Sequence, residues 1–287
     1  MKRPRILILL LLLATMLPTW SQTKGTAAVD STTVVTLLKE AAQLPASTNL
    51  PLFFAKKFNG RPYVAHTLEV NDREQLVVNT RELDCTTLVE NVVALTLCTR
   101  NHQTSMADFR RQLTRLRYRH GILDGYTSRL HYFSDWIDDN HDKGLVTEIQ
   151  RPNPPFTQEQ TVRVDYMSTH PKSYKALANH PELVSAIAQQ EQELTGRRYR
   201  FIPKASVANS PLLRKVIKDG DIIAITCNKP GLDIAHLGFA VWRSDGLHLL
   251  NASQLHKKVV TEPMTLGQYL SKHPSHTGIR IVRINHP

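Results

Sequence analysis

The stretch Arg81-Glu-Leu-Asp-Cys-Thr-Thr-Leu-Val-Glu-Asn91 decides how this chain folds. It follows an extended segment at residues 75–79, and apolar residues at helical spacing then predict a helix from about Cys85 to Leu97. Asp84 or a neighbouring threonine is suited to cap this helix. Cys85 would lie in the first turn, where free N–H groups and the positive end of the helix dipole stabilise a thiolate. The sequence therefore offers a nucleophilic thiol, with a buried structural cysteine as the alternative.

The C-terminal part of the chain carries a strand pattern. Apolar runs at residues 222–227, 236–242 and 247–253 are separated by turn residues. The Asp-Gly pair at 245–246, between the last two runs, is a strong hairpin signal. A helical half with Cys85 thus precedes a β half with His236, and the sequence predicts an α+β fold.

The register of this hairpin decides whether His236, the candidate base, has a polar side chain beside it that can orient its ring. If the turn centres on residues 244 and 245, His236 lies opposite Ser253, and Asn251 is two positions along from Ser253. Side chains alternate along a strand, so His236 and Asn251 share a face and lie diagonally across it. This favours a Cys–His–Asn arrangement, although any one of thirteen histidines can be a surface residue. A slip of one residue would separate the pair, and Ser253 is the first alternative to Asn251.

The first 22 residues read as a secretory signal peptide. Three cations within the first five residues precede the apolar run 6–14, and a polar exit follows. We expect cleavage near Ser21 or Gln22 and a protein exported to the periplasm without a stable membrane anchor. A retained N-terminal anchor is the alternative, although the apolar run is short for a membrane span.

Charge and cysteine usage narrow the class of protein. The formal charge is +11, and +8 without the leader, which suits anionic polymers such as cell wall. Export argues against nucleic acid as a partner. The odd count of cysteines (Cys85, Cys98 and Cys227) leaves at least one free thiol or an intermolecular link. No two cysteines have metal-ligand spacing, so we expect no metal.

The sequence predicts three regions. Residues 1–22 form the signal peptide, and residues 23–59 form an N-terminal helical segment that begins with a flexible exit at 23–30. Residues 60–287 form the catalytic domain, with a strand near residues 75–79 and a helical insertion at about 102–205.

Several motifs together resemble one family. Gly60-Arg-Pro-Tyr63, Asp84-Cys-Thr-Thr87, Gly220-Asp-Ile222, His236-Leu-Gly238 and the Asn251 strand occur in the order seen in NlpC-like cell-wall hydrolases. The segments 83–95 and 126–137 are more specifically similar to the N-acetylmuramoyl-L-alanine amidase-like branch, long catalogued as a domain of unknown function. The resemblance covers about residues 50–285.

This resemblance implies a circularly permuted, papain-like fold in which the cysteine helix packs on an antiparallel sheet. It implies that Cys85 is the nucleophile, His236 the base and Asn251 the third polar residue. Tyr63 matches a tyrosine that shapes the site, with an ordinary turn aromatic as the alternative. The wider family often has His where Asn251 stands, and His66 occupies a position where Gly is expected.

The resemblance also implies substrate and chemistry. The enzyme would be a cysteine amidase that cleaves the lactyl–L-Ala bond of muropeptides, including anhydro-muropeptides, without a metal or organic cofactor. Arg129, His131 and Asp135 are candidates for substrate binding, whereas the aromatic residues of that segment favour core packing. The alternatives are a γ-D-glutamyl–diaminopimelate endopeptidase of the same fold and a non-catalytic cell-wall-binding module.

Overall fold

The computed structural model describes residues 20–286 and has an α+β architecture with one antiparallel sheet. The strands lie in the order β2-β3-β8-β4-β5-β6-β7, and β1 pairs with the end of β8. Their bounds are β1 Val146–Ile149, β2 Gln158–Thr161, β3 Arg198–Pro203, β4 Ile222–Cys227, β5 Ile234–Trp242, β6 Leu247–Ser253, β7 Lys258–Thr261 and β8 His276–Ile284. The predicted α+β class is confirmed.

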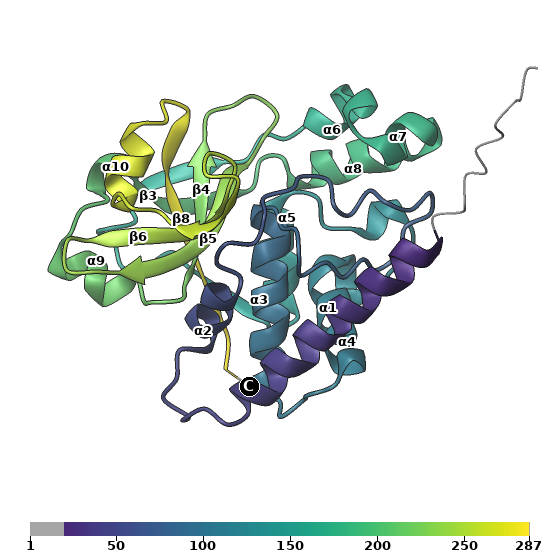
Figure 1. Cartoon of the computed structure of the whole chain (residues 1–287). Helices are drawn as coiled ribbons and strands as arrows, with labels where there is room; N and C mark the ends of the chain where they lie inside the picture. Colours follow the sequence, from purple (N-terminus) through teal and green to yellow (C-terminus); the bar gives the residue numbers. More distant parts are fainter. Residues whose placement is uncertain (1–19, 287) are drawn as a thin grey trace, which may run out of the picture.

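Helices cover both faces of the sheet: α3 and the helices around it pack on one face, and α9 and α10 pack on the other (Figure 1). The helices are α1 Trp20–Ala41, α2 Leu50–Lys57, α3 Cys85–Arg100, α4 Met106–Arg117, α5 Phe133–Asp142, α6 Tyr166–Thr169, α7 Lys175–Asn179, α8 Val184–Leu194, α9 Pro211–Val216 and α10 Leu266–Ser271. None of the described helices is long and apolar enough to cross a bilayer. The predicted leader, up to the start of α1, lies outside the described residues.

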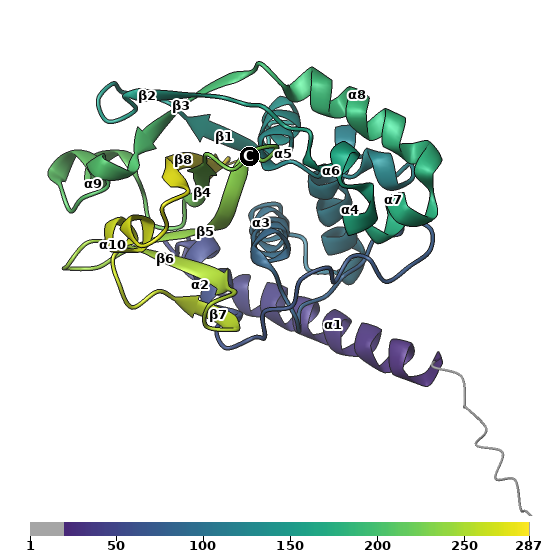
Figure 2. The same ribbon diagram turned by 90° about the horizontal axis from the view of Figure 1, so that it is seen from above.

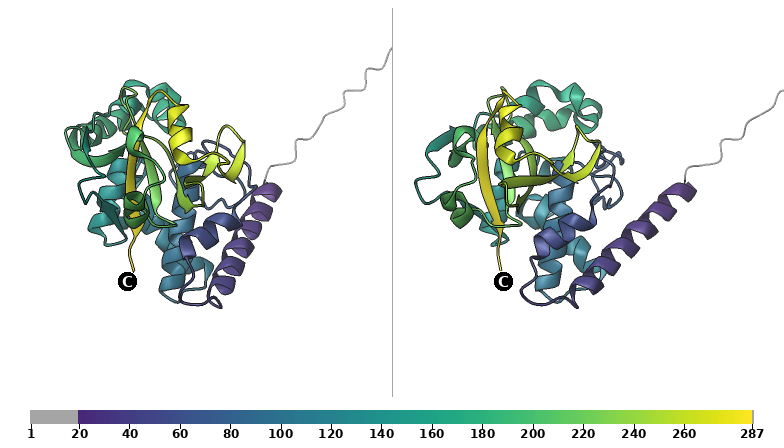
Figure 3. Two further views of the ribbon diagram at one scale, coloured as in Figure 1. Left: turned by 90° about the vertical axis from the view of Figure 1, so that its left-hand side faces the viewer. Right: turned by 60° about the vertical axis from the view of Figure 1, so that its left-hand side comes forward.

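The helix α3 is buried on nearly all sides. Every residue from Thr87 to Cys98 is buried, as expected for a helix that packs between other elements. On one side it meets Leu237 and Phe239 of β5, and on the other it meets α1, α2 and α4. Figure 3 shows α1 along the outside of this helical layer, away from the sheet. The start of α3 is thereby fixed against the start of β5.

A small lobe has an apolar core of its own. Its members come mainly from α6, α7, α8 and the strand β3, together with Tyr126 and Tyr132. Helices α4 and α5 belong instead to the main core, through residues such as Phe109 and Trp136. Seen from above, α3 is viewed along its axis with the sheet on one side and the lobe on another (Figure 2). The predicted insertion at about 102–205 thus contains both main-core helices and this lobe.

The strand predicted near residues 75–79 is wrong, because this segment forms no ladder with a neighbour. Side chains satisfy its backbone instead. The carbonyl groups of residues 75, 77 and 79 accept hydrogen bonds from the side chains of Tyr118, Arg117 and Asn91, respectively. A buried carbonyl needs a partner of some kind, and here the partners are polar side chains of the helical layer.

The flexible exit expected at residues 23–30 is also wrong, since α1 is helical from Trp20. The carboxylate of Asp30 is buried and accepts hydrogen bonds from both the backbone N–H (2.8 Å) and the hydroxyl (2.7 Å) of Thr80. Val34 and Leu38 are fully buried on the same helix. These tertiary contacts extend the helix beyond what local propensity indicates.

Candidate active site

Cys85 is the first residue of α3, as predicted. Asp84 caps the helix: its Oδ1 accepts a hydrogen bond from the Thr87 N–H at 2.7 Å, and the Thr87 hydroxyl accepts one from the Asp84 N–H at 2.9 Å. This reciprocal cap fixes the direction in which the chain enters the helix. Cys85 as a residue keeps part of its surface exposed, whereas Cys98 is fully buried in the core.

The electrostatics of the thiol differ from the expectation. Burial, followed by the charge of Asp84, raises the pKa of Cys85 to about 12, although hydrogen bonds with the backbone of Leu237 and with Thr86 oppose this shift. The predicted stabilisation of a resting thiolate is therefore wrong in direction. The capping carboxylate explains part of the result, because a negative charge beside the thiol offsets the helix dipole.

The hairpin has the predicted register. Trp242 pairs with Leu247 and Phe239 with Leu250. The Nε2–H group of His236 donates a hydrogen bond of 2.9 Å to Oδ1 of Asn251. Asn251 is fully buried, and burial lowers the pKa of His236, against the opposing effects of Asn251 and the charge of Glu262. The imidazole is thus kept neutral and oriented.

One pocket of about 160 Å³ brings together Cys85 and His236. Its lining also includes Thr86 of α3 and Leu237 of β5, and Met167 and Tyr174 from the lobe. These lining residues place the pocket where the start of α3, the start of β5 and the lobe meet. A thiol, a neutral imidazole and backbone N–H groups at a helix start are the components of nucleophilic acyl transfer.

His131 lines the same pocket, whereas Tyr63 is not one of its lining residues. A ring nitrogen of His131 is 3.1 Å from the carbonyl oxygen of Tyr126, and the two rings are in tilted contact with their centres 4.5 Å apart. Burial and the charge of Arg129 lower the pKa of His131 to about 3. The ring is therefore uncharged at neutral pH and forms part of the pocket wall. The backbone of Tyr63 pairs with that of Leu83, two residues before α3, and burial, followed by the charges of Cys85 and Asp84, raises the pKa of Tyr63.

Arg129 faces a neighbouring cavity of about 350 Å³. Its guanidinium forms ion pairs with Glu74 and with Glu69, the latter at 2.6 Å, and lies 4.9 Å from the centre of the Tyr126 ring. Both carboxylates come from the segment 68–75. The arginine therefore ties this segment to the start of the lobe, and its charge is already balanced.

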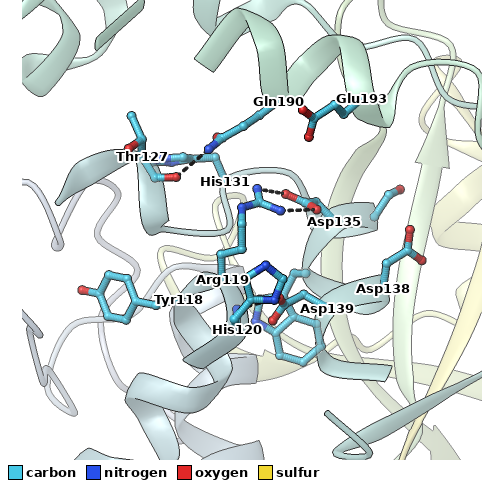
Figure 4. A network of polar contacts seen from close by, with 12 residues as sticks. Tyr118, Arg119, His120, Thr127, His131, Asp135, Asp138, Asp139, Gln190 and Glu193 are labelled. Atoms are coloured by element: carbon cyan, nitrogen blue, oxygen red, sulfur yellow. Dashed lines mark hydrogen bonds and ion pairs between the residues drawn. The ribbon is translucent and has the colours of Figure 1, made fainter. Parts of the chain in front are cut away.

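Asp135 lies in another ion pair, shown in Figure 4. Its two oxygens accept hydrogen bonds from Arg119 at 3.1 and 2.5 Å, a bidentate geometry. In the same view, Gln190 of α8 donates to the carbonyl oxygen of Thr127 at 2.8 Å. These contacts join α5 and the lobe to the segment 119–128, outside the lining of the Cys85 pocket.

The pocket contains residues that the sequence alone did not reveal. Met167 and Tyr174 lie in a part of the chain with weak periodicity, and no motif marks them. Glu262 is buried behind Asn251 and accepts a hydrogen bond from its amide. The diagonal rule leads to Glu262 once the register of β6 and β7 is known, but the connection between these strands carries no Asp-Gly signal that would set it. No group of three or more His, Cys, Asp or Glu side chains among residues 20–286 is arranged to hold a metal ion.

Comparison with known proteins gives one family. The AmiA-like family, described as N-acetylmuramoyl-L-alanine amidase-like, matches residues 53–279. No curated protein matches the chain.

Solved structures are similar over most of the chain. An N-acetylmuramoyl-L-alanine amidase from Bacteroides uniformis is 43% identical, with a TM-score of 0.76 over 82% of this chain and 97% of that one. A Bacteroides fragilis protein described as a xylanase is 44% identical, with the same TM-score over 81% of this chain and 100% of that one. A Legionella pneumophila protein at 22% identity (TM-score 0.68, covering 90% and 96%) shares the fold.

Proposed function

Because this chain belongs to the AmiA-like family of N-acetylmuramoyl-L-alanine amidase-like proteins, we propose that it cleaves the amide between the lactyl group of N-acetylmuramic acid and L-alanine in muropeptides. The observation that carries the proposal is the shared pocket of Cys85 and His236, with Asn251 hydrogen-bonded to the imidazole. We further propose that the fold is a circularly permuted papain-like one and that the mature enzyme works in the periplasm.

The reaction starts from a neutral pair. The Cys85 pKa is raised and the His236 pKa is lowered, so the thiol and the imidazole are both uncharged at neutral pH. His236 takes the thiol proton as the sulfur attacks the amide carbonyl, which forms a carbon–sulfur bond and a tetrahedral oxyanion. The backbone N–H of Cys85, in the first turn of α3, is the proposed donor to this oxyanion, because the N–H of Thr87 is already bound to Asp84.

The second half of the reaction returns the proton. The imidazolium of His236 protonates the nitrogen of L-alanine, the carbon–nitrogen bond breaks, and a thioester on Cys85 remains. Water then gives a proton to His236, attacks the thioester and releases the lactyl carboxylate, while the sulfur regains its proton. Asn251 orients the ring through both steps and stabilises its charged form.

The chemistry of the pocket separates this proposal from glycoside hydrolysis, the activity named for one structural neighbour. Glycosidases ordinarily use two carboxyl groups on either side of the bond. Among the described residues that line the pocket, Asp233 is the sole carboxylate. Its Oδ2 accepts a hydrogen bond of 2.6 Å from the Ser134 N–H at the start of α5. This pocket therefore favours acyl transfer.

The test is product analysis with defined substrates. The purified mature protein is incubated with an anhydro-muropeptide and a matching reduced muropeptide, and the products are separated by liquid chromatography and identified by mass. We expect a free stem peptide that begins with L-alanine. Products that retain L-Ala–D-Glu on the sugar would identify the endopeptidase instead, and xylo-oligosaccharides from xylan would identify a glycosidase.

The controls use two of the three cysteines. Cys85→Ala removes the proposed nucleophile and should abolish product formation. Cys227→Ser changes a partly exposed thiol outside the pocket lining and should leave it intact. If no substrate is cleaved but muropeptides bind, the protein is a binding module and the proposal fails.

A further inference from the structure

The amide of Asn251 is held at both ends. Its Oδ1 accepts the hydrogen bond from His236, and its Nδ2 donates one of 2.9 Å to Oε1 of Glu262. The same Nδ2 makes two longer contacts, of 3.4 and 3.5 Å, with the carbonyl oxygens of Val260 and Leu249, so the bond to Glu262 is the shortest that the NH₂ group makes. Both Asn251 and Glu262 are fully buried. The contact repeats the geometry of the first hairpin, because Asn251 pairs with Val260 across β6 and β7 and Glu262 lies two residues further along. Two consecutive diagonal contacts thus run from His236 into the interior.

Both the side chain and the backbone of Glu262 make hydrogen-bond contacts. Its Oε2 lies 3.0 Å from Nε2 of His256, which is partly exposed. Its backbone N–H donates to Leu249 (2.8 Å), and its carbonyl oxygen lies 2.9 Å from Nδ1 of His248. A buried carboxylate is costly to maintain without partners, and these contacts supply them. The backbone contacts fix the position of the residue, and a movement of the carboxylate away from Asn251 would also break its contact with His256.

The direction of these bonds follows from the chemistry of the groups. An ionised carboxylate only accepts hydrogen bonds, so the side of Asn251 that faces Glu262 must be the NH₂ group. The carbonyl oxygen of Asn251 then faces His236, and a carbonyl oxygen also only accepts. Nε2 of His236 must therefore carry the proton. Nδ1 is left unprotonated in the neutral ring and available as the base.

We propose that Glu262 is a positioning residue that sets the tautomer of His236 by fixing the orientation of the Asn251 amide. This rests on the proposed function in naming His236 as the base. The chain of contacts gives Glu262 a role in the reaction although it does not line the Cys85 pocket. A rotated Asn251 would point NH₂ at His236 and favour the wrong tautomer, and Glu262 excludes that rotation.

The experiment compares two substitutions of Glu262. Glu262→Gln keeps a carbonyl oxygen that accepts from Asn251, so we expect kcat to fall by less than about tenfold. Glu262→Met has a similar length but no such acceptor, so only the two longer contacts with the carbonyl oxygens of Val260 and Leu249 remain to oppose rotation of the amide. We expect a loss of about ten- to hundredfold in kcat, typical of orienting partners, with little change in KM.

A double-mutant cycle separates positioning from a general structural role. In the Asn251→Ala background there is no amide left to orient, so Glu262→Met should cause less than about a twofold further loss. The matched control is Asp221→Asn, which alters another buried carboxylate of the sheet, one bound to Arg283 rather than to Asn251. It should lower the melting temperature without affecting kcat.

Nitrogen-15 NMR of labelled histidine reads the tautomer directly and needs no activity. The wild-type His236 should show a protonated Nε2 and an unprotonated Nδ1, and Asp221→Asn should match it. Glu262→Met should show a mixture of the two tautomers. If this variant fails to fold, two others decide: Asn251→Ala should show a mixture, and Glu262→Gln should show the wild-type tautomer. An unchanged tautomer in Glu262→Met or Asn251→Ala, or an additive loss in the cycle, would overturn the proposal. A correct tautomer without amidase activity would instead refute only the proposed function.

Discussion

The two walls of the Cys85 pocket are built in different ways. The wall formed by α3 and the sheet has a reciprocal helix cap at Asp84 and a continuous series of buried hydrogen bonds from His236 to Glu262. The opposite wall comes from a lobe whose helices α6 and α7 have only four and five residues and whose core is a separate small cluster. Helices this short depend on tertiary contacts. We infer that the first wall fixes the reacting groups and the second wall selects the substrate.

The largest effect should follow the loss of the base. His236→Ala removes the group that accepts the Cys85 proton and later gives it to the leaving amine, so kcat should fall by about a hundredfold to ten thousandfold. Steady-state rates of L-alanyl peptide release measure this. Another histidine that lines the pocket, His131, is the matched control, and His131→Phe should retain most of kcat. Similar losses for both variants would contradict the division between the two walls.

A smaller loss is expected at the orienting residue. Asn251→Ala leaves His236 able to move a proton but no longer fixed in one tautomer, so kcat should fall less than for His236→Ala. Asn251→His should retain substantial activity, because an imidazole can donate to Glu262 and accept from His236 at once. The comparison requires kcat values for the three variants. An unchanged kcat and pH profile in Asn251→Ala would remove Asn251 from the site.

The lobe wall should affect binding more than chemistry. Tyr174→Ala removes an aromatic surface from the pocket and should raise KM by up to about tenfold, while kcat stays near the wild-type value. Tyr166 of the same lobe stacks on His170 and does not line the pocket, so Tyr166→Ala is the control and should leave KM unchanged. A fall in kcat with constant KM for Tyr174→Ala would mean that the lobe takes part in catalysis.

The same contrast explains what the sequence could predict. The start of α3 and the β5–β6 register follow from local rules, a capping residue and an Asp-Gly turn, and both predictions are confirmed. Glu262 follows from the same diagonal rule, but its register depends on the four-residue connection 254–257, which carries no Asp-Gly signal. The lobe residues Met167 and Tyr174 reach the pocket only through tertiary packing, which no local pattern encodes.

The sequence could not predict the raised pKa of the Cys85 thiol, for a different reason. A helix start lowers a cysteine pKa in isolation, but burial and the Asp84 charge act on Cys85 in the opposite direction. The same aspartate is both the cap that fixes the helix and a charge that disfavours the thiolate. Local sequence identifies the cap, whereas the depth of burial depends on how the sheet and the lobe close over the thiol.

The smallest expected effect is a change in the shape of a pH profile. With its pKa raised to about 12, Cys85 should react with iodoacetamide at a rate that keeps rising above about pH 8.5, where an ordinary cysteine reaches half its maximal rate. The neutral imidazole is the active form of His236, and its pKa is lowered. The acid limb of kcat/KM should therefore lie below about pH 6.5, and activity should persist at pH 6. Mass spectrometry of the alkylated peptides follows Cys85, while buried Cys98 serves as the unreactive control in the folded protein. A plateau of Cys85 alkylation below pH 8 would show that the helix start outweighs burial and Asp84, and the reaction would then begin from a thiolate–imidazolium pair.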